Sequence, residues 1–172
     1  MEEKKPMSHL TAGLLIGALL VIYSMVIKFL NLKDGAGTGL LQVAIIIGAL
    51  AFFVNQYGKS KNFTETFGNL FAYGFKTTAV FTIISIAFSI IFFLVFPDMK
   101  EQSLELARQQ MEEKNMPDDQ IEKAIEITKK FFWVGVIGGS MLFLIIIGAI
   151  GSLIGAGITK KQPRSPFDQQ SI

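Results

Sequence analysis

Residues 73–96 read YGFKTTAVFTIISIAFSIIFFLVF, an apolar stretch that contains a single charged side chain, Lys76. Because an α-helix rises about 1.5 Å per residue, ~20 apolar residues are enough to cross the ~30 Å hydrocarbon core of a bilayer. Three further apolar stretches approach or exceed this length, at residues 10–30, 40–57 and 131–158. The sequence therefore predicts an all-α integral membrane protein, a bundle of four helices that span the lipid bilayer.

The composition excludes several classes of function. The chain of 172 residues is 51% hydrophobic, has a formal net charge of +2, and contains one histidine and no cysteine. Disulfides, thiolate ligands and cysteine nucleophiles are therefore impossible, and a lone histidine excludes a multi-histidine metal site. No Asp or Glu lies within the four stretches, so an acid–base pair for catalysis inside the membrane is missing. We expect one membrane domain over residues 1–172, with no enzymatic activity, no catalytic or metal-binding residue, no cofactor and no nucleic-acid partner.

The distribution of basic residues predicts the orientation, because lysine and arginine collect on the cytoplasmic side of a membrane. The two termini and the loop between the second and third spans share one side, and together they carry seven bases: Lys4, Lys5, Lys59, Lys61, Lys160, Lys161 and Arg164. The loop at residues 97–130, on the other side, carries six bases but nine acids. We therefore expect both termini to be cytoplasmic and this loop to lie outside, although Lys129 and Lys130, beside the fourth span, favour the opposite orientation.

This outer loop is expected to fold as a helical hairpin over residues 98–130. Pro97 ends the third span, because proline cannot continue a helix. Asn115 suits a left-handed helix C-cap between the two halves of the hairpin. We expect the second helix to run unbroken into the fourth span, and residues 163–172, which contain two prolines, to form a disordered tail. Apolar residues line one face of each half, at Leu104, Ala107 and Met111 and at Ile121, Ala124 and Ile125.

The segment between the second and third spans has the pattern of a short interfacial helix. Asn62 precedes Glu65 at the spacing of a capping box. Phenylalanine and leucine then recur at helical spacing. We expect an amphipathic helix over residues 62–73 that lies at the membrane interface and leads into the third span; a plain cytoplasmic loop is the alternative.

Glycines at four-residue spacing mark the first and fourth spans. This spacing lets two helix backbones approach closely, so these residues are candidates for helix packing. Packing of the first and fourth spans within one bundle is the simplest interpretation, while a homodimer and a flexible hinge stay open as alternatives. The candidates are Gly13, Gly17, Gly135, Gly139, Gly151 and Gly155.

A polar stripe runs along the third span. Thr78, Thr82, Ser85 and Ser89 fall at positions i, i+4, i+7 and i+11, which places their hydroxyl groups on one face of a helix. Such a stripe could line a transport pathway. Ordinary hydrogen bonding between packed helices is the simpler explanation.

Three segments of the chain together resemble a known family. The first is FTETFG at residues 63–68 followed by Tyr73-Gly74-Phe75, the second is Phe96-Pro97-Asp98, and the third is MPDDQIEKA at residues 116–124. In this order and spacing they resemble a bacterial four-span membrane family, domain of unknown function 4199, over nearly the whole chain. The resemblance implies a protein of the bacterial inner membrane. It implies no activity and carries over no functional residue.

Two functions from different classes fit the sequence. The first is a non-enzymatic interaction or scaffold protein of the inner membrane, which binds another membrane protein or a second copy of itself through the outer hairpin or the glycine faces. The second is a small transporter or channel-forming subunit that works as a homo-oligomer. The polar stripe of the third span is the feature that separates them.

Overall fold

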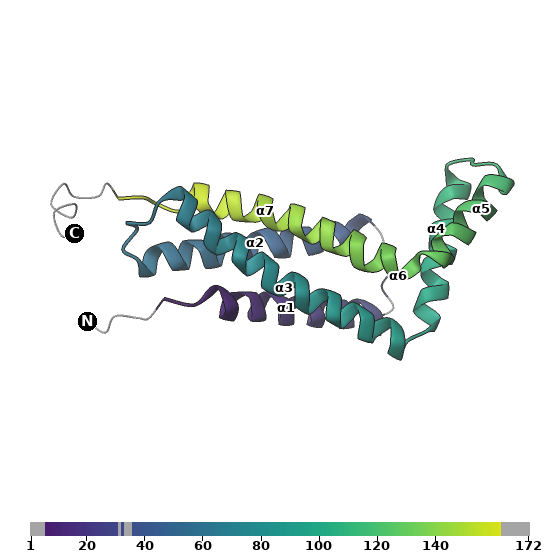
Figure 1. The fold of residues 1–172 in the computed structure, drawn as a ribbon, viewed down its shortest axis with the longest axis horizontal. Helices are drawn as coiled ribbons and strands as arrows, with labels where there is room; N and C mark the ends of the chain where they lie inside the picture. The colour runs from purple at the N-terminus through teal and green to yellow at the C-terminus, as the bar shows by residue number, and fades with distance from the viewer. Residues whose placement is uncertain (1–5, 31, 33–35, 163–172) are drawn as a thin grey trace. The chain divides into compact units, whose positions relative to one another are not determined.

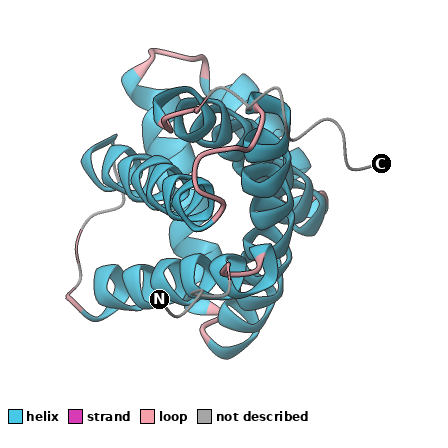
Figure 2. Ribbon diagram, turned by 90° about the vertical axis from the view of Figure 1, so that its left-hand side faces the viewer, coloured by secondary structure: helices cyan, strands magenta, loops and turns pink. Residues whose placement is uncertain are grey.

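The computed structural model describes residues 6–30, 32 and 36–162, and within these ranges every regular element is a helix (Figure 2). Four helices are long and apolar enough to cross a membrane: His9–Phe29, Gly37–Ser60, Phe67–Val95 and Phe132–Ile158. The prediction of an all-α chain with four membrane-length helices is confirmed. The elements in chain order are α1 (His9–Phe29), α2 (Ala36–Ser60), α3 (Phe67–Val95), α4 (Asp98–Glu113), α5 (Asp118–Lys130), α6 (Phe132–Val134), the π-helix η1 (Gly135–Gly139) and α7 (Ser140–Ile158).

The described helices group into two compact units. The first unit holds the described residues up to Ser85 together with those from Leu144 onward, and thus α1, α2, most of α3 and most of α7. The second unit is Ile86–Phe143, which contains the end of α3, the helices α4, α5 and α6, and η1. Each unit has buried residues of its own.

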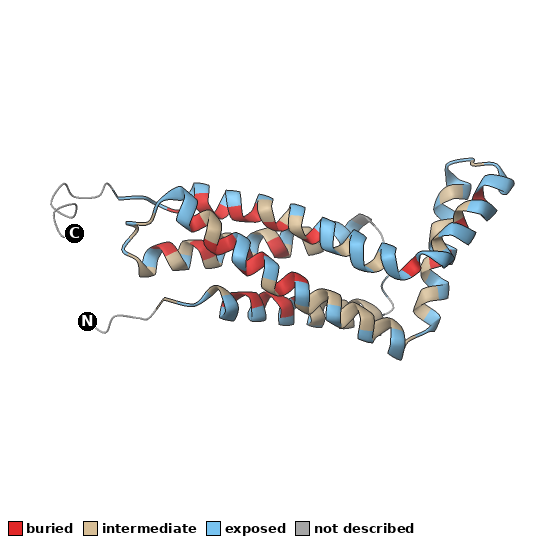
Figure 3. Ribbon diagram, in the orientation of Figure 1, coloured by how far each residue is buried: buried red, intermediate tan, exposed pale blue. Residues whose placement is uncertain are grey.

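The core of the first unit is built from all four of its helices. Ile16, Leu20, Ile46, Leu50, Phe81 and Leu144 form one buried cluster, and Ala12, Val54, Leu70, Tyr73 and Ala156 form another. Figure 3 shows these buried positions as bands along the helices, alternating with exposed ones. The exposed positions are also apolar, as at Leu14, Leu40 and Ile83. In a membrane the exposed side chains contact lipid chains, which are as apolar as leucine. An apolar exterior around a packed core is therefore expected for a membrane-spanning bundle.

The described chain ends of the first unit lie together with the segment that joins α2 to α3 (Figure 1). The Tyr73 hydroxyl donates a hydrogen bond to the Met7 carbonyl over 3.1 Å. Near the other terminus, the backbone N–H of Gln162 donates to the Phe63 carbonyl over 2.8 Å. The N-terminal segment, the α2–α3 segment and the C-terminal segment therefore meet at one end of the bundle, as an even number of spans requires.

The predicted interfacial helix over residues 62–73 is wrong. Asn62 and Phe63 have positive φ angles of 51° and 58°, a backbone conformation that ends α2 instead of starting a helix. The next helix begins at Phe67, where the Thr66 hydroxyl accepts a hydrogen bond from the Asn69 N–H over 3.2 Å. Thr66 therefore caps α3, and the expected amphipathic residues from Phe67 onward belong to the first turns of this single long helix.

In the second unit, α4 and α5 form the expected hairpin. Leu104 of α4 and Ile121 and Ile125 of α5 are buried between charged outer faces. Asn115 has a φ of 53°, and the Met116 N–H donates to the Met111 carbonyl over 3.2 Å. This is the left-handed C-cap that the sequence predicted.

The prediction of one unbroken helix from Asp118 to the end of the fourth span is wrong. α5 ends at Lys130, Phe131 leaves the helical conformation with φ −104° and ψ 20°, and η1 interrupts the span at Gly135–Gly139. The Phe132 and Trp133 rings each pack edge-on against Phe93, which gives the break a fixed aromatic contact. Three glycines in η1 lower the preference for regular α-helix there. The predicted tail at residues 163–172 lies outside the described residues.

Candidate functional site

The glycines of α1 face α3. A methyl group added at Gly13 would lie 2.5 Å from Val80 Cβ and 3.0 Å from the Thr77 carbonyl oxygen. One turn later, a methyl group at Gly17 would lie 2.9 Å from two carbons of Ile84. Contacts this short leave no room for a side chain, so the two glycines bring the backbones of α1 and α3 close together.

The glycines of α7 face α2 and α3. An added methyl group would lie 2.9 Å from Leu50 Cδ1 at Gly151 and 3.0 Å from Val54 Cβ at Gly155. At Gly148, which the sequence analysis did not single out, it would overlap the Thr78 side chain of α3. Gly13 and Gly17 of α1 and three glycines of α7 thus pack inside one bundle, but against α3 and α2 and not against each other.

Gly135 and Gly139 are different from the other candidates. Both lie in η1 and are exposed, and among the described residues no atom of another turn or helix comes within 4 Å of a methyl group added at either one. The same four-residue spacing therefore marks packed glycines in α1 and α7 and open ones in η1. π-Helical turns are rare and frequent at functional sites, which makes η1 notable, but its contacts assign it no partner.

The polar stripe of α3 is only partly available for chemistry. Thr78 and Thr82 are buried, whereas Ser85 and Ser89 are half-buried. The Thr78 hydroxyl donates to the Gly74 carbonyl of its own helix over 3.1 Å. The Thr82 hydroxyl oxygen is buried and has no hydrogen-bond partner among the described residues.

Three buried hydroxyl groups outside the stripe extend this pattern. Thr77, Ser152 and Thr159 each donate to the carbonyl four residues earlier in their own helix, over 2.7 to 2.9 Å. Sequence reasoning missed Ser152 and Thr159, because isolated hydroxyl groups in an apolar span carry no periodic signal. Because these hydroxyl groups are bound to the backbone of their own helix, few polar groups are left to line a transport pathway.

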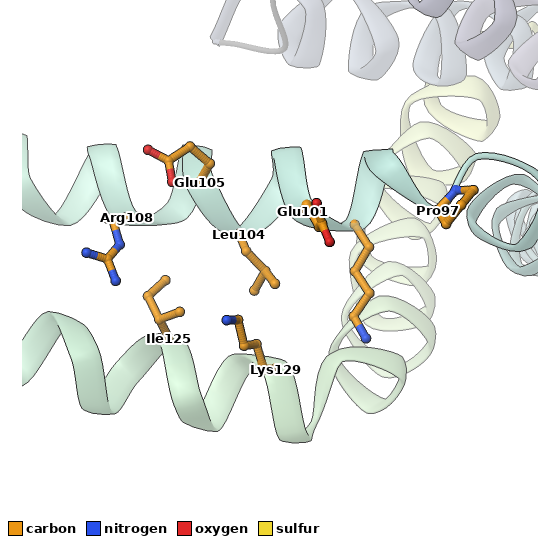
Figure 4. A pocket seen from close by; sticks show the side chains of 8 residues that line it. Pro97, Glu101, Leu104, Glu105, Arg108, Ile125 and Lys129 are labelled. Atoms are coloured by element: carbon orange, nitrogen blue, oxygen red, sulfur yellow. The ribbon is translucent and has the colours of Figure 1, made fainter.

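A cavity of about 820 Å³ opens in the hairpin between α4 and α5 (Figure 4). Its apolar lining comes from Pro97, Leu104 and Ile125, and its charged lining from Lys100, Glu101, Glu105, Arg108 and Lys129. This cavity could not be predicted from the sequence, since its charged residues come from two helices whose relative rotation is set only when they pack. No group of three or more histidine, cysteine or acidic residues that could hold a metal ion occurs in the described chain.

A comparison with protein families matches residues 11–161 to the family described as protein of unknown function (DUF4199). The chain belongs to this family. The match includes the membrane-length helices α2 and α3 in full, the hairpin and the break at η1, so the resemblance seen in three short segments holds for the bundle as a whole. Searches of curated proteins and of solved structures found no match.

Membership in DUF4199 says which family the chain belongs to, but it indicates no activity, since the family has no assigned function. The described part offers two polar features beside its apolar core: the hydroxyl groups buried in the first unit and the charged cavity of the hairpin.

Proposed function

We propose that this protein is a non-enzymatic interaction or scaffold protein of the bacterial inner membrane, with both termini in the cytoplasm and the α4–α5 hairpin as its partner-binding surface. The observation that carries the proposal is the structure of the connection between α3 and the fourth span. A connection between two packed helices needs only about 2–8 residues. Here the chain forms two helices, Asp98–Glu113 and Asp118–Lys130, with buried contacts of their own.

The packing of the first unit supports the same proposal. Its helices approach through glycine contacts, and its interior is filled by the two apolar clusters. The hydroxyl groups of Thr77, Thr78 and Ser152 are satisfied by their own helices. Such a bundle anchors the chain in the membrane. The hairpin is then the part whose polar surface is available to bind a partner protein.

Photo-crosslinking from the hairpin tests this function. With a photoreactive residue at Gln110 or at Glu122, both exposed, we expect intact membranes to give an adduct of the same mass from either position. The matched control carries the probe at Ile83, an exposed apolar position of α3, where lipid is the expected neighbour. An adduct at twice the mass of the chain would identify a second copy as the partner. A protein that stays uncrosslinked at both hairpin positions would contradict the proposal.

One observation favours the alternative, a small transporter or channel-forming subunit that works as an oligomer. The Thr82 hydroxyl is buried in the first unit without a hydrogen-bond partner in the described chain. A buried polar atom of this kind costs free energy unless water or a ligand satisfies it. Together with Ser85 it would be the centre of a polar pathway on α3.

Flux measurements separate the two functions. We expect proteoliposomes in gradients of potassium chloride, glycerol or urea to behave as empty vesicles, because most buried hydroxyl groups are bound to their own backbone. Light scattering after rapid mixing measures this. Protein-dependent flux that disappears in Ser85→Leu but persists in Ser24→Leu would overturn the expectation. Ser24 is the control because it lies on α1, where its hydroxyl donates to the Leu20 carbonyl of the same helix.

A further inference from the structure

Two lining residues of the hairpin cavity lie close to the points where the chain leaves its apolar spans. Pro97 follows α3 by two residues, and Lys129 precedes the fourth candidate span, which starts at Phe132, by three. The buried side chains of Leu104 and Ile125 form the apolar part of its lining. The cavity therefore combines an apolar lining with cationic groups, in a segment that begins and ends where the chain is expected to meet lipid headgroups.

The cationic groups of the cavity are directed into it. Figure 4 shows the guanidinium of Arg108 and the ammonium of Lys129 in the gap between the two helices, whereas the Glu105 carboxylate points away from it. Within the described chain, no carboxylate forms an ion pair with Arg108 or Lys129. Their hydrogen-bond donors are therefore free to bind an anion, and a guanidinium suits phosphate oxygens in particular.

Lys100, the third base of the cavity, is held by an aromatic ring. Its ammonium nitrogen lies 4.9 Å from the centre of the Phe132 ring, close enough for a cation–π contact. Phe132 in turn packs edge-on against Trp133, with ring centres 5.7 Å apart. Aromatic residues of this kind collect at the headgroup level of membranes. Lys100 of the cavity is thus linked through Phe132 to Trp133, a pair of aromatic residues suited to the membrane interface.

The charges of the hairpin are also sorted along its length. The half next to the spans, residues 97–108 and 125–130, has four bases and four acids, whereas the tip, residues 109–124, has two bases and five acids. The half next to the spans is therefore neutral and the tip has a net charge of −3, so an anionic membrane surface repels the tip and does not repel the half next to the spans. This distribution favours a hairpin whose base contacts lipid headgroups while its tip points into water.

We propose that the cavity between α4 and α5 binds the phosphate group of an anionic phospholipid, with Arg108 and Lys129 as donors and Leu104 and Ile125 against the apolar part of the lipid. Inorganic phosphate also presents anionic oxygens, but it has no apolar part to contact Leu104 and Ile125. The inference does not depend on the protein-partner proposal, because the lipid site lies at the base of the hairpin and the crosslinking positions lie nearer its tip.

Trp133 provides the measurement, because it is the only tryptophan of the chain and lies beside the site. The full-length protein is reconstituted in phosphatidylcholine vesicles that contain either brominated phosphatidylglycerol or brominated phosphatidylcholine, and bromine quenches nearby tryptophan. We expect phosphatidylglycerol to bind next to Trp133 with a preference of about fivefold. In the double variant Arg108→Gln, Lys129→Gln the preference is expected to fall to about one.

Two variants and one competitor make the result decisive. The double variant Lys114→Gln, Lys123→Gln removes the same charge at the tip and is expected to keep the preference, as is Arg108→Lys, which keeps the charge in place. Equal quenching by both lipids in the unchanged protein would overturn the proposal, and so would an equal loss in the tip variant. If inorganic phosphate in the buffer abolishes the preference, the ligand is a soluble phosphate and the lipid is excluded.

Discussion

Replacing Gly148 by alanine is expected to lower the free energy of unfolding by about 2–3 kcal/mol, the upper part of the range for overpacking a filled core. The added methyl group would overlap the methyl group of Thr78 and lie 2.8 Å from Thr78 Cβ. A Cβ atom moves only with its backbone, so α7 and α3 must separate to relieve the contact. Unfolding by a denaturing detergent in mixed micelles measures the loss.

Gly157→Ala is the matched control for this prediction, because no described atom outside its own turn lies within 4 Å of the added methyl group. We expect it to change the free energy of unfolding by less than about 0.5 kcal/mol. Thr78→Ala should restore part of the stability of Gly148→Ala, since it removes the two atoms nearest to the new methyl group. Equal effects at Gly148 and Gly157, or strictly additive effects at Gly148 and Thr78, would contradict the contact between the helices.

The four spans could be predicted because length and apolar composition alone decide whether a helix crosses a membrane. The partners of the glycines could not. Gly13 packs against Val80 and Gly151 against Leu50, yet Gly135, with the same spacing, has no such neighbour within the described residues. In water the buried face of a helix is the more apolar one. In lipid both faces are apolar, so the sequence does not say which face meets which helix.

The two breaks in the helical pattern were missed for a related reason. Asn62 fitted a helix start by its spacing to Glu65, but its positive φ ends the preceding helix instead. Phe131 carries no signal of a break, and the contacts of Phe132 and Trp133 with Phe93 exist only in the folded chain. Asn115 was predicted correctly, because proline follows two residues later and a polar helix precedes it, so local chemistry was sufficient.

The polar features of the structure were also only partly predictable from the sequence. The stripe of hydroxyl groups on α3 is a property of one helix and was visible in the sequence. Whether those groups are free depends on rotamers that direct Thr78 to its own backbone and leave Thr82 without a described partner. The hairpin cavity needs two helices in register to bring Arg108 and Lys129 to one gap. No periodicity within either helix contains that information.

Replacing Phe81 by alanine is expected to lower the free energy of unfolding by about 2–3 kcal/mol. Phe81 is 0% exposed, and it lies in the cluster that joins α1, α2 and α7 through Ile16, Leu50 and Leu144. Moving an apolar side chain from lipid into the protein contributes little. The cost is therefore that of the cavity, ~24 cal/mol per Å³ over the roughly 100 Å³ that the ring vacates.

Phe52→Ala is the control that isolates this cavity cost. Phe52 belongs to α2 and is 56% exposed on the apolar exterior, so lipid chains can fill the space that its ring leaves. We expect it to cost less than about 1 kcal/mol in the same detergent titration. In water both truncations would also lose the transfer free energy of the ring, and the difference between them would be blurred. Equal losses at the two positions would mean that the first unit has no tightly packed centre at Phe81.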